Sequence, residues 1–217
     1  MSTPAARLAT PHGAVTAHGH PGAVREDPPS LLAPVPPDRR AGATAGNTAG
    51  NTAGDTAAAV DSRHFRNILG RFATGVVAIT AIDPATGEPC GIAANSFTSV
   101  SLDPPLVAFC VAHTSTTWPR LRSAGRMCVN VLAEHHEDVS RQLAARGPDK
   151  FAGLAWTFSP GGHPLIDETL AWIDCSIEAE HIAGDHIIVV ARVHDLGAHA
   201  DRGPLVFFRG SYNRLDG

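Results

Sequence analysis

The sequence lacks the patterns by which several large protein classes are recognised. It has no apolar run approaching the ~20 residues that a helix needs to cross a bilayer. It contains neither a G-x-G-x-x-G fingerprint nor a P-loop, so any nucleotide must be bound by other means. The formal net charge is −4 and no cluster of Lys and Arg stands out along the chain, which argues against nucleic acid or a membrane as a partner.

Paired cysteines and metal-binding motifs are also missing. The 12 histidines form no H-E-x-x-H motif, and the adjacent His135 and His136 would lie on different faces of a helix, so we expect no metal site. The four cysteines form no C-x-x-C pair, and three of them lie in apolar, strand-like runs, where a free thiol packs as a small hydrophobe. We therefore expect free thiols in a reducing cytoplasm.

Aromatic residues and cysteine are absent from the first 60 residues, which are rich in Ala, Gly, Thr and Pro and include the near-repeat AGNTAGNTAGDTAAA. Such a segment cannot bury enough apolar surface to offset its backbone entropy. It also lacks the charged start and apolar stretch of a secretory signal. We expect residues 1–60 to be a disordered tail, residues 61–217 to form one domain, and the protein to be cytoplasmic.

Strands outnumber helices in the remaining sequence. Phe65, Ile68, Leu69 and Phe72 recur at helical spacing and predict a helix over residues 61–75, which Gly75 helps to end. Further helices are expected over 115–125 and 137–146, and strands over 76–82, 90–95, 105–112, 127–133, two runs within 171–196, and 204–212. The loop 147–167 is too long for a simple connection. Because helices do not alternate with strands, we predict a closed antiparallel barrel with a few helices at its rim.

Two polar clusters interrupt the apolar runs. The first comprises Asn95, Ser96, Thr98, Ser99 and Ser101, and the second comprises Ser115, Thr116 and Thr117. The first cluster could merely cap the backbone of its own loop. Together with exposed backbone amides, it could instead hold a phosphate or the polar edge of a ring. The second cluster starts a predicted helix, whose dipole favours phosphate.

Several single residues allow both a structural and a functional interpretation. Asp185 and His186 could be a turn residue and a strand histidine with an ordinary partner. They could also be a histidine that faces a pocket and a neighbour that orients it. The same two interpretations apply to Lys150 and Phe151, at the start of the long loop, and to Arg209 and Tyr212, near the end of the last strand.

Six motifs, in order, resemble the flavin reductase family, the short-chain NAD(P)H:flavin reductase components of two-component flavin-dependent monooxygenases. The motifs are FATGVVAIT, ANSFTSVSLDPPLV, CVNVL, DKF, GDH and PLVFFRGSY, and they extend over most of the domain. One departure is Met127, where the family usually has Phe. This difference affects packing and leaves the chemistry unchanged.

The resemblance implies a mainly β fold, a split β-barrel of the FMN-binding type with a few flanking helices, which dimerises with flavin at the dimer interface. It implies that residues 95–99 line the isoalloxazine and ribityl chain, and that residues 115–117 lie near the phosphate. Lys150 and Phe151 would close over the flavin, from the same or the second subunit. The candidate cofactor-binding residues are Asn95, Ser96, Phe97, Thr98, Ser99, Ser115, Thr116, Thr117, Lys150, Phe151, Asp185, Arg209 and Tyr212, and His186 is the candidate catalytic residue beside the nicotinamide.

These features predict an NAD(P)H-dependent flavin reductase. It would transfer hydride from NADH or NADPH to FMN or FAD and release reduced flavin to a partner monooxygenase. No side chain need act as an acid or base, so His186 is expected to position the nicotinamide. Two alternatives stay open: a reductase that keeps FMN bound and reduces another acceptor, such as ferric iron or a corrinoid, and a non-enzymatic flavin-binding module.

Overall fold

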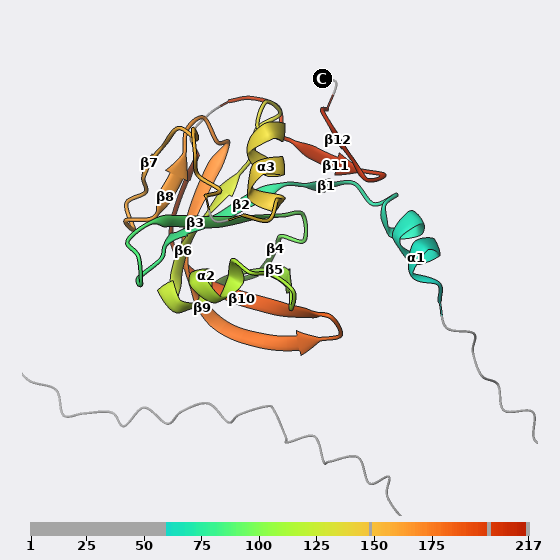
Figure 1. The fold of residues 1–217 in the computed structure, drawn as a ribbon, viewed down its shortest axis with the longest axis horizontal. Coiled ribbons are helices and arrows are strands. Elements are labelled where there is room, and N and C mark those ends of the chain that lie inside the picture. Colours follow the sequence, from blue (N-terminus) through green and yellow to red (C-terminus); the bar gives the residue numbers. More distant parts are fainter. Residues whose placement is uncertain (1–59, 148, 199–200, 216–217) are drawn as a thin grey trace, which may run out of the picture. The chain divides into compact units, whose positions relative to one another are not determined.

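The computed structural model describes residues 60–147, 149–198 and 201–215, so the tail expected over residues 1–60 lies outside the described residues except for its last position. The described part belongs to one unit of the chain, Thr56–Gly217. It contains antiparallel β-structure and three helices (Figure 1). Within this part, no helix is long and apolar enough to cross a membrane.

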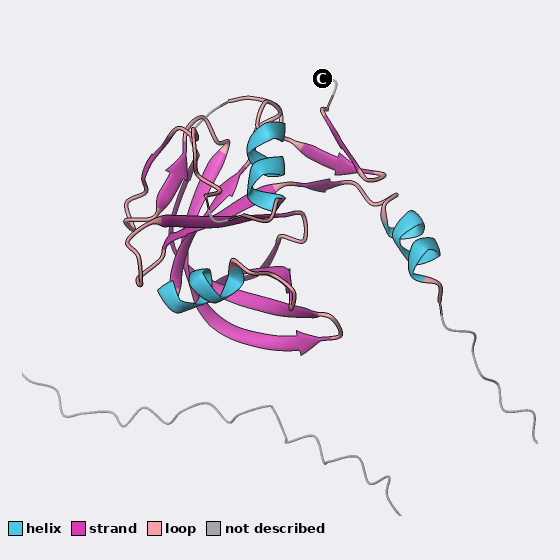
Figure 2. Cartoon of the chain, in the orientation of Figure 1, coloured by secondary structure: helices cyan, strands magenta, loops and turns pink. Residues whose placement is uncertain are grey.

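A seven-stranded antiparallel sheet in the order β3-β2-β6-β9-β10-β5-β4 forms the body of the domain (Figure 2). Its strands are β2 (Val77–Ile82), β3 (Pro89–Ala94), β4 (Thr98–Leu102), β5 (Pro105–Ala112), β6 (Arg126–Val131), β9 (Ala171–Ala183) and β10 (His186–Ala198). The predicted strands β2, β3 and β5 and the long pair β9–β10 are confirmed, as is the mainly β fold, and β2 pairs with β3 as a hairpin. The strand β4 was not predicted, because polar side chains dominate its sequence.

Two small sheets complete the fold. One contains β1 (Thr74–Gly75), β11 (Val206–Phe208) and β12 (Ser211–Asn213), and the other contains β7 (Trp156–Phe158) and β8 (Pro164–Ile166). The single strand predicted over 204–212 was wrong, because Arg209 and Gly210 form a turn between β11 and β12. Both turn residues have positive φ angles, 52° and 78°, as the tight turn of a two-residue hairpin loop requires.

The helices are α1 (Ser62–Leu69), α2 (Trp118–Ala124) and α3 (Glu137–Ala144). Asp61 caps α1, since its carboxylate accepts a hydrogen bond of 2.8 Å from the backbone N–H of His64. The predicted length of α1 was wrong, because the helix ends at Leu69 with Gly70 as its C-cap, well before Gly75.

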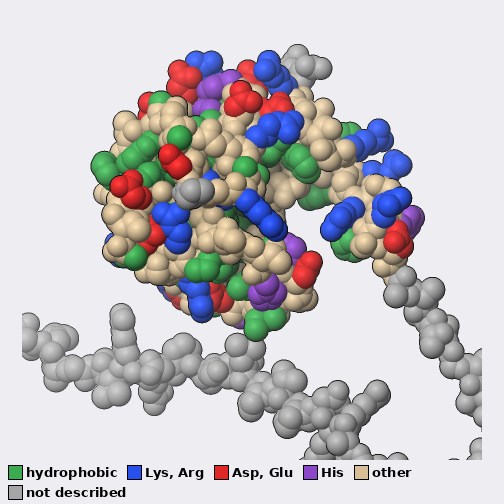
Figure 3. Space-filling view, viewed as in Figure 1, with side chains coloured by type: hydrophobic (Ala, Val, Ile, Leu, Met, Phe, Trp, Pro, Cys, Tyr) green, Lys and Arg blue, Asp and Glu red, His purple; other side chains and the backbone are tan. Residues whose placement is uncertain are grey.

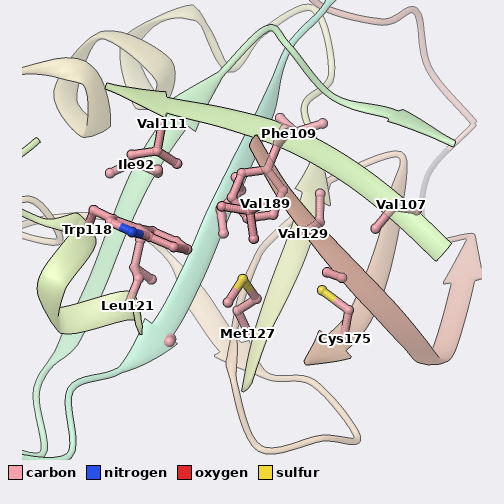
Figure 4. Packing of buried hydrophobic residues seen from close by; sticks show 14 of the residues in the cluster. Ile92, Val107, Phe109, Val111, Trp118, Leu121, Met127, Val129, Cys175 and Val189 are labelled. Carbon is pink, nitrogen blue, oxygen red and sulfur yellow. The ribbon is translucent and has the colours of Figure 1, made fainter. Parts of the chain in front are cut away.

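The core lies inside the curl of the main sheet. Ile92 on β3 and Val111 on β5 belong to the same buried cluster, although the two strands are not neighbours in the sheet (Figure 4). The rings of Phe109 and Trp118 pack there edge to face, with centroids 6.0 Å apart. A second cluster, on the other face of β2, contains Phe151.

All four cysteines are free, as expected. Burial raises the pKa of Cys90 to about 11 and that of Cys175 to about 12, and it raises the pKa of Cys128 further. These three thiols therefore stay protonated near neutral pH and act as packing groups.

Asn130 connects the long loop to the main sheet. Its side chain is fully buried on β6, and its oxygen accepts a 2.8 Å hydrogen bond from the backbone N–H of Ile166 on β8. Its amide group donates to the Thr80 hydroxyl at 3.0 Å, and that hydroxyl donates to the carbonyl of Pro164 at 2.5 Å. Two polar side chains of the sheet thus hold the end of the loop 147–167 in place.

We predict that Asn130→Ala lowers the free energy of unfolding by about 1–3 kcal/mol, because it leaves the buried N–H of Ile166 without an acceptor. Urea denaturation measures this change. The exposed Asn213, whose amide bonds only to nearby backbone carbonyls, provides the control, and Asn213→Ala should be nearly neutral. Equal stability of the two variants would contradict the assigned role of Asn130.

Candidate functional site

A cavity of about 390 Å³ opens beside the ends of β3 and β5. In Figure 1 this region lies between α3 and the β9–β10 pair. The lining residues are 92–96, 110–112, 114–117, 143–146, Lys150 and His186. The volume falls within the range of about 300–1,000 Å³ that is usual for small-molecule sites.

The cavity brings together both polar clusters that the sequence singled out. The predicted site residues that line it are Asn95, Ser96, Ser115, Thr116, Thr117, Lys150 and His186. Apolar residues of β3 and β5, including Ala94 and Val111, form the wall between the clusters. The cavity therefore combines hydrogen-bonding groups with an apolar wall.

The hydroxyl groups in the cavity differ in their availability. The Ser96 hydroxyl accepts a 2.9 Å hydrogen bond from the backbone N–H of Cys110 and lies 3.3 Å from the carbonyl of the same residue. The Ser115 hydroxyl accepts from the backbone N–H of Trp118 at 3.2 Å. Within the described part of the chain, the hydroxyls of Thr116 and Thr117 form no hydrogen bond. These two groups can therefore bind a ligand without losing a partner.

Among the described residues, two cations and no carboxylate line the cavity. Lys150 donates a 2.8 Å hydrogen bond from Nζ to the carbonyl of Leu143, at the end of α3. Burial lowers the pKa of Lys150, and the positive charge of Arg120 lowers it further. The second cation, Arg146, was not among the predicted residues, although it ends the run that predicted α3. Together these cations favour an anionic group such as a phosphate.

His186 is the first residue of β10 and lines the cavity. The Nδ1 of His186 donates a 2.7 Å hydrogen bond to the carboxylate of Asp185, and this bond lowers the pKa of Asp185. Asp185 itself does not line the cavity. Its bond to Nδ1 fixes the ring orientation and leaves Nε2 available to a ligand.

Three of the predicted flavin-contacting residues lie outside the cavity. Thr98 and Ser99 are exposed on β4, where the Thr98 hydroxyl bonds to the carbonyl of Ser99 at 3.2 Å. Phe97 packs against the main core. The sequence did not reveal this, because nothing in the polar run after Ser96 indicated that it forms the strand β4, which pairs with β5 at the edge of the sheet.

Phe151, Tyr212 and Arg209 also lie outside the cavity. Phe151 is 7% exposed and packs edge to face with Trp156, with centroids 6.1 Å apart. The Tyr212 hydroxyl lies 2.8 Å from that of Ser140, at a smaller cavity of about 180 Å³ that shares Asn95 with the first. Arg209 lines a separate hollow beside α1.

The described residues contain no group of three or more His, Cys, Asp or Glu side chains that could hold a metal ion. The donor set of the cavity instead suits a flavin nucleotide, which has a flat ring with one polar edge and a phosphate. The apolar wall matches the ring, while the threonine hydroxyls, Asn95 and the two cations match the polar groups.

Comparisons with known proteins point to the same ligand class. The family model described as "Flavin reductase like domain" matches residues 69–216. The flavin-dependent monooxygenase reductase subunit HsaB of Rhodococcus jostii (strain RHA1) is 46% identical over 158 residues, which cover 73% of this chain and 80% of that protein. Among solved structures, nitrilotriacetate monooxygenase component B from Mycobacterium thermoresistibile gives a TM-score of 0.69 at 45% identity, covering 73% of this chain and 88% of that one.

A further similar structure was determined with ligands. The NADH:FAD oxidoreductase SgcE6 of Streptomyces globisporus, in complex with NAD and FAD fragments, gives a TM-score of 0.67 at 34% identity, covering 72% of this chain and 93% of that one. The chain therefore belongs to the flavin reductase-like family. Its fold is the split β-barrel of that family, and its activity is the reduction of flavin by a reduced nicotinamide nucleotide, as predicted. Of the alternatives left open, the non-enzymatic module is thereby excluded.

Proposed function

We propose that the 390 Å³ cavity binds the isoalloxazine, ribityl chain and phosphate of a flavin, and that the domain 61–217 passes reduced flavin to a separate monooxygenase. The observation that carries this proposal is the convergence of unpaired hydroxyls, two cations and an oriented histidine at an apolar wall. Similarity to HsaB, a reductase subunit of a monooxygenase, supports the release of reduced flavin to a partner. Similarity to an NADH:FAD oxidoreductase supports NADH as the electron donor.

The chain's own residues bind and orient the reactants. A bound flavin supplies the redox chemistry, since it accepts hydride from the nicotinamide. Thr116 and Thr117 donate hydrogen bonds to the ligand, and Lys150 and Arg146 neutralise its phosphate. His186, held by Asp185, positions the nicotinamide over the flavin. Thr98 and Ser99 do not line this cavity, and their contact with the flavin stays a prediction.

We predict that Lys150→Met raises the dissociation constant of FMN about 10- to 100-fold, because a hydrogen bond to a charged group contributes about 1.5–3 kcal/mol. Fluorescence titration with FMN and with FAD measures the change. Lys150→Arg keeps the charge and should retain most of the affinity. Because Lys150 also bonds to α3, thermal unfolding of each variant must be recorded alongside. If Lys150→Met binds FMN with wild-type affinity, Lys150 does not contact the flavin.

His186→Ala separates a role in nicotinamide positioning from a role in flavin binding. We predict a flavin affinity close to that of the wild type, together with a fall of about tenfold or more in the rate of flavin reduction or in NADH affinity, because a small misplacement of the donor is costly. Stopped-flow reduction over a range of NADH concentrations measures both. Asp185→Asn, which weakens the hold on Nδ1, should give a smaller effect of the same kind. Normal kinetics at every NADH concentration would show that His186 has no such role.

The helix α1 supports the proposal that the enzyme is a homodimer. None of its residues is buried, and its apolar side chains are about half exposed: Phe65 is 54%, Ile68 is 48% and Leu69 is 56% exposed. The polar side of the helix, with Arg66 and Arg71, is the side that lines the hollow beside Arg209. An amphipathic helix with its polar side toward its own chain presents an apolar face that a second copy can cover.

Phe65→Glu tests this arrangement. Burying a side chain of this size contributes about 1.5–3 kcal/mol, so we predict that the dimer dissociation constant rises at least about tenfold. Sedimentation velocity over a range of protein concentrations measures the shift. Arg63→Glu, on the polar side of the same helix, should leave the dimer intact. A wild-type protein that is monomeric and fully active at micromolar concentration would contradict the proposal.

A further inference from the structure

A hollow of about 480 Å³ beside α1 is lined by arginine, asparagine and glycine alone. The lining residues are Arg66, Asn67, Gly70, Arg71, Arg209 and Gly210. They come from α1, from the two residues that follow it and from the turn between β11 and β12, which is far away in the sequence. In Figure 3, basic side chains (blue) gather on the part of the molecule at the right of the view, where Figure 1 places α1. We propose that this hollow is a second anion site, which binds the phosphate group of a small molecule outside the flavin cavity.

The hollow is built by a close approach of two backbones. The backbone N–H of Arg209 donates a 2.7 Å hydrogen bond to the carbonyl of Gly70. A Cβ atom at Gly70 would lie 3.6 Å from the Cα of Arg209 and only 3.0 Å from the carbonyl oxygen of Arg66. The glycine therefore allows the end of α1 to meet the turn and brings the three arginines around one space.

The backbone of Arg209 has a conformation that is unfavourable in free energy for a residue with a side chain. Its φ is 52°, in the left-handed region where two-residue hairpin turns normally place Asn or Gly. Its guanidinium carbon lies 5.0 Å from the centre of the Phe208 ring, in a cation–π contact. Strained residues that persist in a fold occur preferentially at ligand sites, so the guanidinium at this position indicates a function.

The charge of the hollow is not balanced within the described residues. Five other arginines of the described part pair with carboxylates, whereas Arg63, Arg126, Arg146 and Arg214 do not; the paired ones are Arg120, Arg122, Arg141, Arg192 and Arg202. Arg66, Arg71 and Arg209 form no such pair there, and no carboxylate lines the hollow. Three cations around one space repel each other, and a bound anion removes that repulsion.

The lining indicates a phosphate rather than a nucleotide base or an acidic protein segment. Guanidinium groups bind phosphate through two parallel hydrogen bonds each, and several can share one phosphate. Of the residues that the structure describes, none lining the hollow is an aromatic on which a base could stack, and none forms the apolar lining found in the centre of protein interfaces. The phosphate could belong to a nucleotide, such as the 2′-phosphate of NADPH, or could be a free inorganic anion.

Isothermal titration calorimetry with inorganic pyrophosphate tests the site, on protein saturated with FMN so that the flavin cavity is filled. We expect the wild type to bind pyrophosphate, and Arg71→Ala and Arg209→Asn each to weaken binding about tenfold or more. Asn is a favoured residue for such a turn, so Arg209→Asn should keep or raise the melting temperature. Arg63→Ala, on the same helix but outside the hollow, is the matched control and should bind normally.

Kinetics with NADH and NADPH distinguish the sources of the phosphate. If Arg209→Asn lowers the affinity for NADPH but not for NADH, the ligand of the hollow is the 2′-phosphate of NADPH. If the variant loses pyrophosphate binding while its kinetics with both nucleotides are unchanged, the ligand is a free anion. Three results would overturn the proposal: no pyrophosphate binding by the wild type, equal binding by Arg209→Asn, or binding of a hexaglutamate peptide without binding of pyrophosphate. Flavin reduction by the same preparations reports separately on the flavin cavity, so failure of one proposal is distinguishable from failure of the other.

Discussion

The contact between β3 and β5 determines where the flavin cavity can form. β3 lies at one end of the seven-stranded sheet and β5 lies next to the other end, so they meet only because the sheet curls around its core. Ile92 and Val111 pack inside this closure, and the Ser96 hydroxyl bonds to the backbone of Cys110 across it. The polar groups that follow the two strands then face one space. Without this closure they would lie far apart, and the cavity would not exist.

Much of the fold was predictable because its signals are local. The apolar run of β5 has the expected bounds, and the long pair on either side of Gly184 runs only two residues past its expected end, to Ala198, since apolar content and a turn glycine go far to define them. Gly70 shortened α1, although the apolar spacing continues to Phe72, because the chain must turn there to contact Arg209. Tertiary contact, which no local pattern encodes, decided the end of this helix.

The site was predictable only in part, for the same reason. Thr116, Lys150 and His186 line the cavity as expected, whereas neighbours of Ser96 in the same motif lie on an exposed strand. Sequence proximity places residues on one segment, but strand alternation and reversal decide which of them face a ligand. The arginine hollow shows the opposite case. Arg66, Arg71 and Arg209 form no cluster in the sequence, and the fold alone brings their charges together.

The most direct test of the cavity as a site of flavin exchange is anaerobic stopped-flow mixing of NADH with purified protein and increasing amounts of free FMN. The absorbance of oxidised flavin reports how much is reduced and how fast. We predict a rate that saturates with FMN and a reduction of many equivalents of flavin per protomer, because the flavin enters and leaves as a substrate. Reduction that stops at one equivalent, or that does not respond to added FMN, would contradict this function and favour an enzyme that keeps its flavin and reduces another acceptor.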